Sequence, residues 1–354
     1  MEDRKEATVY KEKEFRERCA ARGLGLEAVE QAVAWVRVLE AEAPGPDGTL
    51  ASASLSEVER HVERLVARGE VRDERLLALA RYFAAAGIEA VAIRLLAYLL
   101  PVGVLPAMAD RLAELEGGPV RDRVMAGVAV PPTGAPPEVY PAATAAFVRA
   151  LESELGAAKA RRVLCWNVHG IPAAAFAAER EAFLASASLE EWLAAFHGRK
   201  VRELERHAED GTLWFEQRIT PAVVDFVRGN QEILSAVSDG RHLWATKIPY
   251  DPDRFLASKD PLEKRRLACH CPLAASSITG TGAGVPAAWC ACSAGYEKFL
   301  FDTVFGEETE AEVTESVLAG DPRCRFRIRI PDSVLERFRT PDPPGSSRRA
   351  GGAA

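Results

Sequence analysis

Hydrophobic residues in the first third of the chain recur every three or four positions, which is the spacing of amphipathic helices. The clearest case begins with Ser54 and Glu57, which have the spacing of a capping box, and ends at Gly69. Its apolar positions are Val58, Val62, Leu65 and Val66. The segment after Gly87 is apolar almost all round, which is typical of a helix buried on every side. We therefore expect residues 1–126 to form an all-helical domain with its core in that segment.

Residues 127–138 read G-V-A-V-P-P-T-G-A-P-P-E and break the helical pattern. Each proline restricts its own backbone and that of the preceding residue, so the segment is predicted to be a short, stiff linker. A second domain is then expected at residues 139–335. Residues 336–354 are poor in apolar side chains, and we expect them to form a disordered tail.

Helical and extended patterns alternate in the second domain. Ser188 and Glu191 form another capping box, and the helix that they begin is expected to end at Gly211. Residues 213–219 and 241–250 have the composition of strands, and between them Thr220-Pro221 is typical of a helix start. The pattern predicts an α+β fold, in which the all-helical N-terminal domain is followed by an antiparallel sheet with flanking helices.

The last two predicted strands show the most regular alternation in the chain. After a turn at residues 319–322, the return strand places Cys324, Phe326, Ile328 and Ile330 inward, and Arg323, Arg325, Arg327 and Arg329 outward. On the preceding strand, Glu315 shares the inward face with Ala311, Val313 and Val317. A buried carboxylate needs a cation, a metal, hydrogen-bond donors or a proton. Glu315 is therefore a candidate general base, ligand anchor or metal ligand, or else a structural acceptor for a neighbouring loop.

Charge and composition narrow the class of protein. A net charge of -7 with 27% charged residues is typical of a soluble globular protein and argues against a nucleic-acid-binding one. The N-terminus lacks the apolar core of a signal peptide, so we expect a cytoplasmic protein. The longest uncharged run lies between Arg94 and Asp110 and contains two prolines, so it falls short of the roughly 20 apolar residues that span a membrane. We expect a buried helix pair there and no membrane contact.

Histidines and cysteines before residue 269 are spread along the chain, and only Cys165 and His169 lie as close as four residues apart, in a segment expected to be extended or a loop. Cys19 and His61 lie on charged helices, where a solvated or packed role is expected. His197 and His207 lie among charged residues of the helix after Ser188, and we expect both to be exposed.

Five of the seven cysteines lie between residues 269 and 324. This crowding is not a disulfide framework, and in a reducing compartment it favours metal binding or thiolate chemistry. If residues 267–271 and 288–292 are two paired strands, four sulfurs lie on one face, about 4.5–5.5 Å apart across the strands. These are the sulfurs of Cys269, Cys271, Cys290 and Cys292. The alternatives are a site for zinc or another thiophilic metal with His270 as reserve ligand, a disulfide, or small buried side chains.

Cys292 is also a candidate nucleophile. Ser293 is expected to cap a helix that ends at Gly306, so Cys292 would lie at the positive end of the helix dipole. That location lowers the pKa of a thiol and favours the reactive thiolate. In this hypothesis Glu315 or His270 acts as the base, and the helix start stabilises developing negative charge.

The run from Cys292 to Ile330, with its small-Gly-Tyr opening, its E-S-V-L strand and G-D-P-R-C-R-F-R-I, resembles known domains. These are the C-terminal half of bacterial 4-vinyl-reductase-like small-molecule-binding domains and the related aminothiazoline-carboxylate-hydrolase-like proteins. Residues 140–331 also resemble a bacterial family of uncharacterised proteins that carries both C-H-C-P and C-x-C-S-A-G-Y.

The resemblance implies a sheet and helices that enclose a ligand cavity, with cysteines that chelate metal in some members. The residues that match the shared hairpin motif are Glu315, Gly320, Asp321, Cys324 and Phe326. From the resemblance we expect Tyr296, Cys324 and Phe326 to contact a ligand.

Three functions are consistent with these patterns. The first is a cytoplasmic small-molecule-binding protein with a metal-loaded, cysteine-rich site in its C-terminal domain. The second is a thiol-dependent hydrolase that acts on a C–N or C–S bond. The third is a helical interaction module, forming a homodimer through residues 1–126, that is coupled to a sensing domain.

Overall fold

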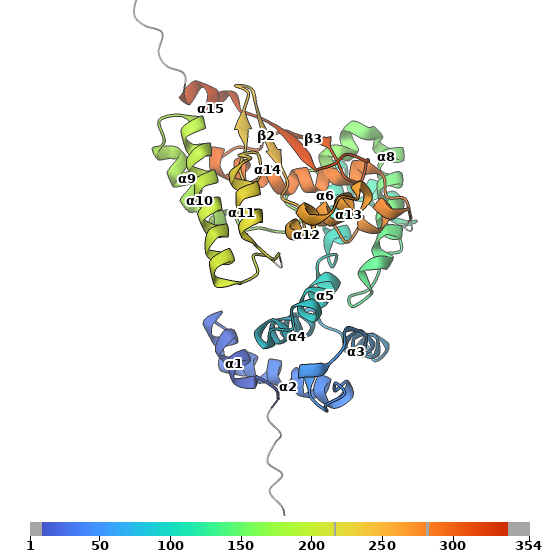
Figure 1. Cartoon of the computed structure of the whole chain (residues 1–354). Helices are drawn as coiled ribbons and strands as arrows, with labels where there is room; N and C mark the ends of the chain where they lie inside the picture. The colour runs from blue at the N-terminus through green and yellow to red at the C-terminus, as the bar shows by residue number, and fades with distance from the viewer. Residues whose placement is uncertain (1–8, 216, 281–282, 339–354) are drawn as a thin grey trace, which may run out of the picture. The chain divides into compact units, whose positions relative to one another are not determined.

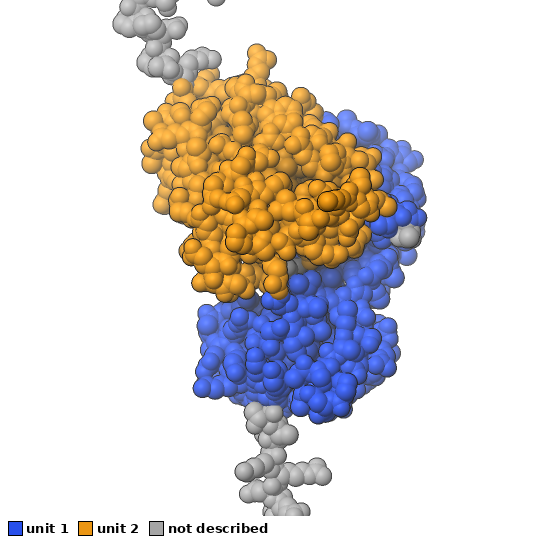
Figure 2. All heavy atoms as spheres, in the orientation of Figure 1, with its two compact units in different colours: residues 1–163, 270–289 blue, residues 164–269, 290–354 orange. Residues whose placement is uncertain are grey.

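The computed structural model describes residues 9–215, 217–280 and 283–338. Contacts between residues divide the chain into two compact units, which Figure 2 colours separately. Unit 1 contains residues 1–163 and 270–289, and unit 2 contains residues 164–269 and 290–354. The chain therefore leaves unit 2 after Cys269 and returns to it at Cys290.

Unit 1 is helical, as the apolar periodicity predicts. Figure 1 shows its first five helices in blue to cyan. The helices are α1 (Glu12–Ala21), α2 (Leu26–Glu42), α3 (Leu55–Ala67), α4 (Asp73–Ala86), α5 (Glu89–Leu99), α6 (Val104–Glu116), α7 (Gly118–Met125) and α8 (Tyr140–Leu164). The capping box at the start of α3 is confirmed, because Glu57 N–H donates to Ser54 Oγ and Ser54 N–H donates to Glu57 Oε2.

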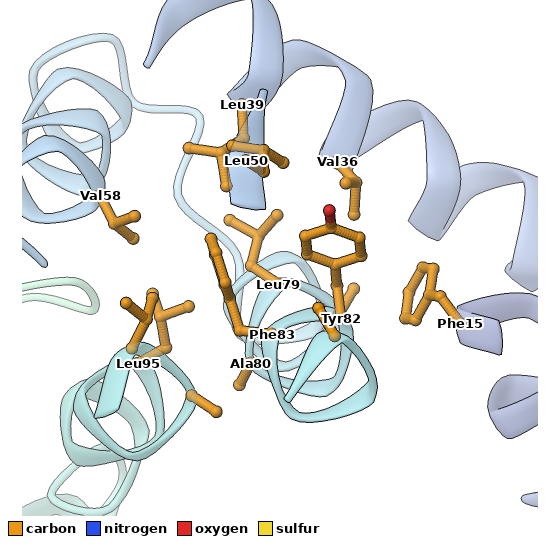
Figure 3. Close-up of a cluster of buried hydrophobic side chains, with 14 of the residues drawn as sticks. Phe15, Val36, Leu39, Leu50, Val58, Leu79, Ala80, Tyr82, Phe83 and Leu95 are labelled. Carbon is orange, nitrogen blue, oxygen red and sulfur yellow. The ribbon is translucent and has the colours of Figure 1, made fainter. Parts of the chain in front are cut away.

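A hydrophobic core in unit 1 is formed by α1, α2, α3, α4 and α5, and Figure 3 shows part of it. Tyr82 and Phe83 on α4 are fully buried, and the ring of Tyr82 meets that of Phe15 edge-on at 5.6 Å. The Tyr82 hydroxyl donates to the carbonyl of Tyr10 at 2.9 Å, which satisfies its polar end. On α5, Leu95 is fully buried but several neighbours are only half-buried. The helix before Gly87 therefore contributes as much to the core as the segment after it.

The proline-rich segment at residues 127–138 is not a linker between the two units, because it lies inside unit 1. Gly134 has a φ of 82°, and a Cβ there would lie 2.8 Å from methyl groups of Val66 and Val71. Glu138 also pairs with Arg94 of α5. The segment packs back onto the helices that precede it, so the boundary falls at Val163 and Leu164 instead.

Residues Glu89–Glu116 are long and apolar enough to cross a membrane by composition, but 44% of the 18-residue apolar window within them is buried inside the molecule. It consists of two helices, α5 and α6, because the chain turns at residues 100–103 and Gly103 adopts a φ of 76°. The expected helix pair is confirmed. Core helices of globular proteins have the same composition, so the stretch is weak evidence for a membrane span.

Unit 2 contains a small sheet and the helices around it. The helices are α9 (Ala177–Ala185), α10 (Leu189–Asp210), α11 (Pro221–Arg228), α12 (Pro252–Ala257), α13 (Pro261–Ala268), α14 (Ala291–Phe305) and α15 (Asp332–Arg337). The strands are β1 (Val237–Ser238), β2 (His242–Thr246), β3 (Ala311–Glu315) and β4 (Arg325–Arg329). The α+β prediction is confirmed.

The sheet is antiparallel, with strand order β1-β2-β4-β3. Leu243 pairs with Ile328, and Ala245 pairs with Phe326. All four side chains are fully buried, which confirms the alternation predicted for β4. Helix α14 contacts β3 and β4, and Figure 1 shows it beside the sheet.

Two expectations for unit 2 are wrong, and the start of the predicted tail needs a correction. Residues 213–219 form only an isolated bridge between Trp214 and Gln217, because Phe215 adopts a φ of 44° and turns the chain. His197 is buried and its Nε2 contacts the carbonyl of Val227 at 3.0 Å. The predicted tail at residues 336–354 begins inside α15, and residues 339–354 lie outside the described residues.

Candidate functional site

Neither of the two segments expected to carry the cysteine cluster is a strand in the structure. Asp260 accepts a hydrogen bond from Leu262 N–H, and Pro261 begins α13, so residues 261–268 are helical and Cys269 follows as the C-cap. Residues 287–290 form a 3₁₀ turn that leads directly into α14. The alternation that placed four sulfurs on one face therefore does not occur. The Asp-Pro helix start outweighs the two-residue alternation of the cysteines.

The four thiols are also divided between the two units. Cys271 and His270 belong to unit 1, where the Trp289 indole N–H lies 3.2 Å from Cys271 Sγ. Cys269, Cys290 and Cys292 belong to unit 2. Among the residues that the structure describes, no group of three or more His, Cys, Asp or Glu side chains could hold a metal ion. Zinc binding stays a prediction.

At the start of α14, the structure favours Cys290 over Cys292 as the reactive thiol. Cys290 is the N-cap residue, so the helix begins three residues earlier than the expected cap at Ser293. Cys292 is buried in the first turn, whereas Cys290 is half-buried and accepts a hydrogen bond of 3.0 Å from the Ser316 hydroxyl. A helix N-terminus and a donated hydrogen bond both favour the thiolate.

Ser316 is held rigidly by the turn that follows β3. Its backbone N–H donates to Asp321 Oδ2 at 2.8 Å, and its Oγ accepts from Leu318 N–H at 3.1 Å. The hydroxyl proton therefore remains available for Cys290. Because Ser316 is almost fully buried, this donor is kept away from competing water.

Glu315 does not point into the core as the alternation predicts. The register between β3 and β4 is irregular between Val313 and Glu315, and a bulge of this kind re-aims the side chains around it. Both Glu315 oxygens accept hydrogen bonds of 2.9 Å from Arg323, through Nε and Nη2. Glu315 is thus an anchor for Arg323, and the predicted role as base or metal ligand stays a prediction that would have to compete with this ion pair.

The outward arginines of β4 are paired rather than solvated. Arg325 donates to Glu232 through Nε at 2.8 Å and lies 4.4 Å above the ring of Trp244. Arg327 pairs with Glu312 on β3. Only Arg329 is exposed.

A cluster of polar side chains lies where the end of β2 meets α14, and we call it the Lys247 cluster. It consists of Lys247, Ser293, Tyr296, Glu297 and His169. Spacings of three and four residues place Ser293, Tyr296 and Glu297 on one side of α14. Lys247 follows β2, and its ammonium lies 3.5 Å from Ser293 Oγ and 5.7 Å from the centre of the Tyr296 ring.

His169 joins the cluster because α14 has no side chain at Gly295. A Cβ on Gly295 would lie 2.1 Å from the backbone nitrogen of Trp166, so only glycine allows this close approach. The segment that passes this point carries His169, whose ring meets Tyr296 edge-on at 5.8 Å. The Gly of the C-x-C-S-A-G-Y motif is therefore a packing requirement.

The charges of the cluster influence one another. Burial raises the pKa of Glu297 to about 7, and the neighbouring Lys247 charge offsets part of that shift. Burial and Lys247 together lower the pKa of His169. Burial raises the pKa of Tyr296. Within the described part of the chain, the Glu297 carboxyl has no hydrogen bond or ion pair, although it is only partly exposed.

The structure separates the three residues that were expected to contact a ligand. Tyr296 belongs to the Lys247 cluster, and its side chain is partly exposed at 40%. Cys324 lies beside the cluster, because its carbonyl accepts from Lys247 N–H at 3.0 Å, and burial raises the pKa of its thiol. Phe326 is fully buried between Ala245 and Val313 in the sheet, so it packs the core instead.

Sequence reasoning missed Lys247, Ser293 and Glu297. The sequence contains one signal for Glu297. It is the only carboxylate between Ala291 and Phe301, and its spacing of four residues from Ser293 places both side chains on one side of a helix. Lys247 had no such signal. It lies in the segment 241–250 that is expected to be a strand, and its neighbours on α14 come about fifty residues later in the sequence.

One segment of the chain matches a protein family. Residues 258–335, less than a quarter of the chain, match the model of a family of unknown function (DUF6144). The segment includes α13, α14 and the β3–β4 hairpin but neither Lys247 nor His169. No curated protein and no solved structure matches the chain.

Proposed function

We propose that unit 2 is a small-molecule-binding domain whose polar ligand contacts come from Lys247, Tyr296 and Glu297. The observation that carries this proposal is that the partly exposed Glu297 carboxyl has no hydrogen bond or ion pair with a described residue, and burial raises its pKa to about 7. A polar group that is partly removed from water without a partner is costly. Such groups occur where a ligand supplies the missing contact.

The cluster can bind and exchange a proton with a ligand. Lys247 supplies a positive charge whose contact with Ser293 is long, so an acceptor on a ligand can compete for it. A carboxyl that titrates near neutral pH is present in both protonation states and can act as acid or base. The proposed ligand is a small molecule with a hydrogen-bond acceptor or acidic group near a transferable proton.

Thermal unfolding of the full chain with a panel of small carboxylates, amides and alcohols at pH 7 tests this proposal. Compounds that bind should raise the Tm of the wild type, and Lys247→Met and Glu297→Gln should both remove that rise. Lys259→Met is the matched control, because Lys259 is exposed and outside the cluster. The proposal is contradicted if no compound raises the Tm of the wild type, or if the two variants show the same rise as the wild type.

A thiol-dependent hydrolase that acts on a C–N or C–S bond is the second candidate, favoured by the Ser316–Cys290 hydrogen bond at the start of α14. In this function Cys290 replaces Cys292 as the proposed nucleophile, and the first turn of α14 stabilises negative charge on the substrate. Cys290→Ala should abolish turnover while the fold is retained. If turnover is lost in Cys292→Ala but kept in Cys290→Ala, then Cys290 is not the nucleophile.

The metal hypothesis has its own test. Protein purified without a metal-affinity tag should contain stoichiometric zinc or another thiophilic metal if Cys269, Cys271, Cys290 and Cys292 bind one. Metal-free protein in which all four thiols react with an alkylating agent would contradict the metal hypothesis. A cytoplasmic location and a homodimer through residues 1–126 also stay predictions, and light scattering on the full chain tests the latter.

A further inference from the structure

A concave site lies in unit 2, and no side chain of α14 lines it. Its volume is about 200 Å³. The lining residues come from α11, the end of β2, α12, α13 and the β3–β4 turn. They are Phe226, Asn230, Ile233, Thr246, Lys247, Pro249, Phe255, Ala268, Pro322 and Arg323.

The walls of this pocket are apolar. Phe226 and Phe255 form two of them, with ring centres 6.3 Å apart and planes tilted by 46°. Ile233 and Ala268 are buried beside them. An apolar cavity of roughly 150 Å³ holds a benzene molecule, so a pocket of about 200 Å³ accommodates one six-membered ring with a small substituent.

The polar groups of the pocket are donors, and its two charged residues are cations. Arg323 uses Nε and Nη2 for Glu315, and no described residue accepts from Nη1. Asn230 accepts from Glu232 N–H through Oδ1, and its Nδ2 has no acceptor among the described residues. Lys247 is the second cation, and the lining includes no carboxylate. The charge complement of this surface is an anion.

We propose that this pocket binds a small monocarboxylate whose apolar body is the size of one six-membered ring. The body lies against Phe226 and Phe255, and the carboxylate accepts hydrogen bonds from Arg323 Nη1 and Asn230 Nδ2. Glu315 accepts from Nε and Nη2 of Arg323 and so leaves Nη1 available to the ligand. This site does not depend on Glu297 and stands without the function proposed above.

Isothermal titration of the full chain with benzoate at pH 7 tests the proposal. Benzoate should bind with a Kd on the order of 1 mM or below, as expected for a ligand of this size. Benzyl alcohol, which has the ring without the charge, and acetate, which has the charge without the ring, should each bind at least about tenfold more weakly. Cyclohexanecarboxylate should bind comparably, because the recognition requires an apolar body and a carboxylate.

Two variants locate the site. Arg323→Gln should weaken benzoate binding about tenfold or more, whereas Arg329→Gln, at the far end of β4 and outside the pocket, should not. Glu315→Gln breaks the same ion pair but keeps the cation, so it should retain binding within a few-fold. Ala268→Phe fills the pocket and should abolish binding. If that variant does not fold by circular dichroism, Phe255→Ala, which removes a wall, should weaken binding instead.

Several results would overturn the proposal. Equal affinity for benzoate and benzyl alcohol would show that charge is not recognised, and equal affinity for benzoate and acetate would show that the apolar walls are not used. Benzoate binding that survives both Arg323→Gln and the folded pocket variant would place the ligand elsewhere.

Discussion

The Ser316 hydroxyl donates a hydrogen bond of 3.0 Å to the sulfur of Cys290, the residue at which α14 begins. Ser316 lies in the turn of the hairpin and Cys290 at the start of a helix, so the contact joins two elements of unit 2. Cys292, two residues later, is buried in the first turn of the same helix.

Replacing Ser316 with Ala should slow the alkylation of Cys290 by iodoacetamide at pH 7. The hydrogen bond favours the thiolate, so its loss lowers the fraction of Cys290 that is ionised. The more basic thiolate is a better nucleophile, so the net slowing is roughly threefold. Peptide mass spectrometry measures the rate at each cysteine, and Cys19, which is buried in unit 1 and whose thiol pKa is raised by burial, is the slow internal control. Faster alkylation of Cys292 than of Cys290 in the wild type would contradict the assignment of Cys290 as the more reactive thiol.

Glu297→Gln should change the pH dependence of stability. The pKa of Glu297 is raised from 4.5 to about 7 in the fold, so the folded state favours the protonated carboxyl. Its contribution is fully present below about pH 4.5 and is lost as the pH rises towards 7. Because the side chain is partly exposed, we expect the variant to gain about 1–2 kcal/mol over the wild type at about pH 8 and nothing at about pH 4.5. Urea unfolding at both pH values measures the difference, and equal gains at both would refute this assignment.

Gly295→Ala should destabilise unit 2 by about 1–3 kcal/mol or prevent its folding, because the new methyl group would overlap the Trp166 backbone. Gly25→Ala is the control. Gly25 has a φ of -68°, and a methyl group added there would have nothing within 4 Å, so its replacement should be nearly neutral. Thermal unfolding compares the two. A Gly295 variant as stable as the control would mean that α14 and the Trp166 segment are not in contact.

His61→Leu should remove part of the acid sensitivity of unit 1. His61 is fully buried, and burial lowers its pKa from 6.5 to about 4 despite the Glu42 carboxylate 2.9 Å from Nδ1. The neutral form is favoured in the fold, so its stability contribution is present above pH 6.5 and is lost as the pH falls towards 4. The wild type should lose up to about 3 kcal/mol more than the variant over that range. If the wild type and the variant lose the same free energy of unfolding between about pH 6.5 and pH 4, the prediction is contradicted.

Local signals in the sequence predicted the helices and the hairpin. The capping box at Ser54 and the helix ending at Gly211 depend on residues a few positions apart, and both are present. The burial of Phe326 and Ile328 follows from the two-residue repeat of a strand. The same repeat gave a wrong prediction for Cys269 and Cys271, because Asp260 and Pro261 begin a helix just before them.

The tertiary structure alone decided how the site is assembled. Glu315 has the sequence position of an inward side chain, yet an irregularity in the strand pairing turns it to Arg323. Lys247 meets Ser293 only because β2 ends beside α14, and no periodicity spans that separation. Hydrogen bonds within a helix or strand are set by neighbouring residues in the chain, whereas the partners of a polar side chain are set by which elements pack together. The sequence by itself therefore determined the elements and their buried faces, and only the packing of those elements determined which charges meet.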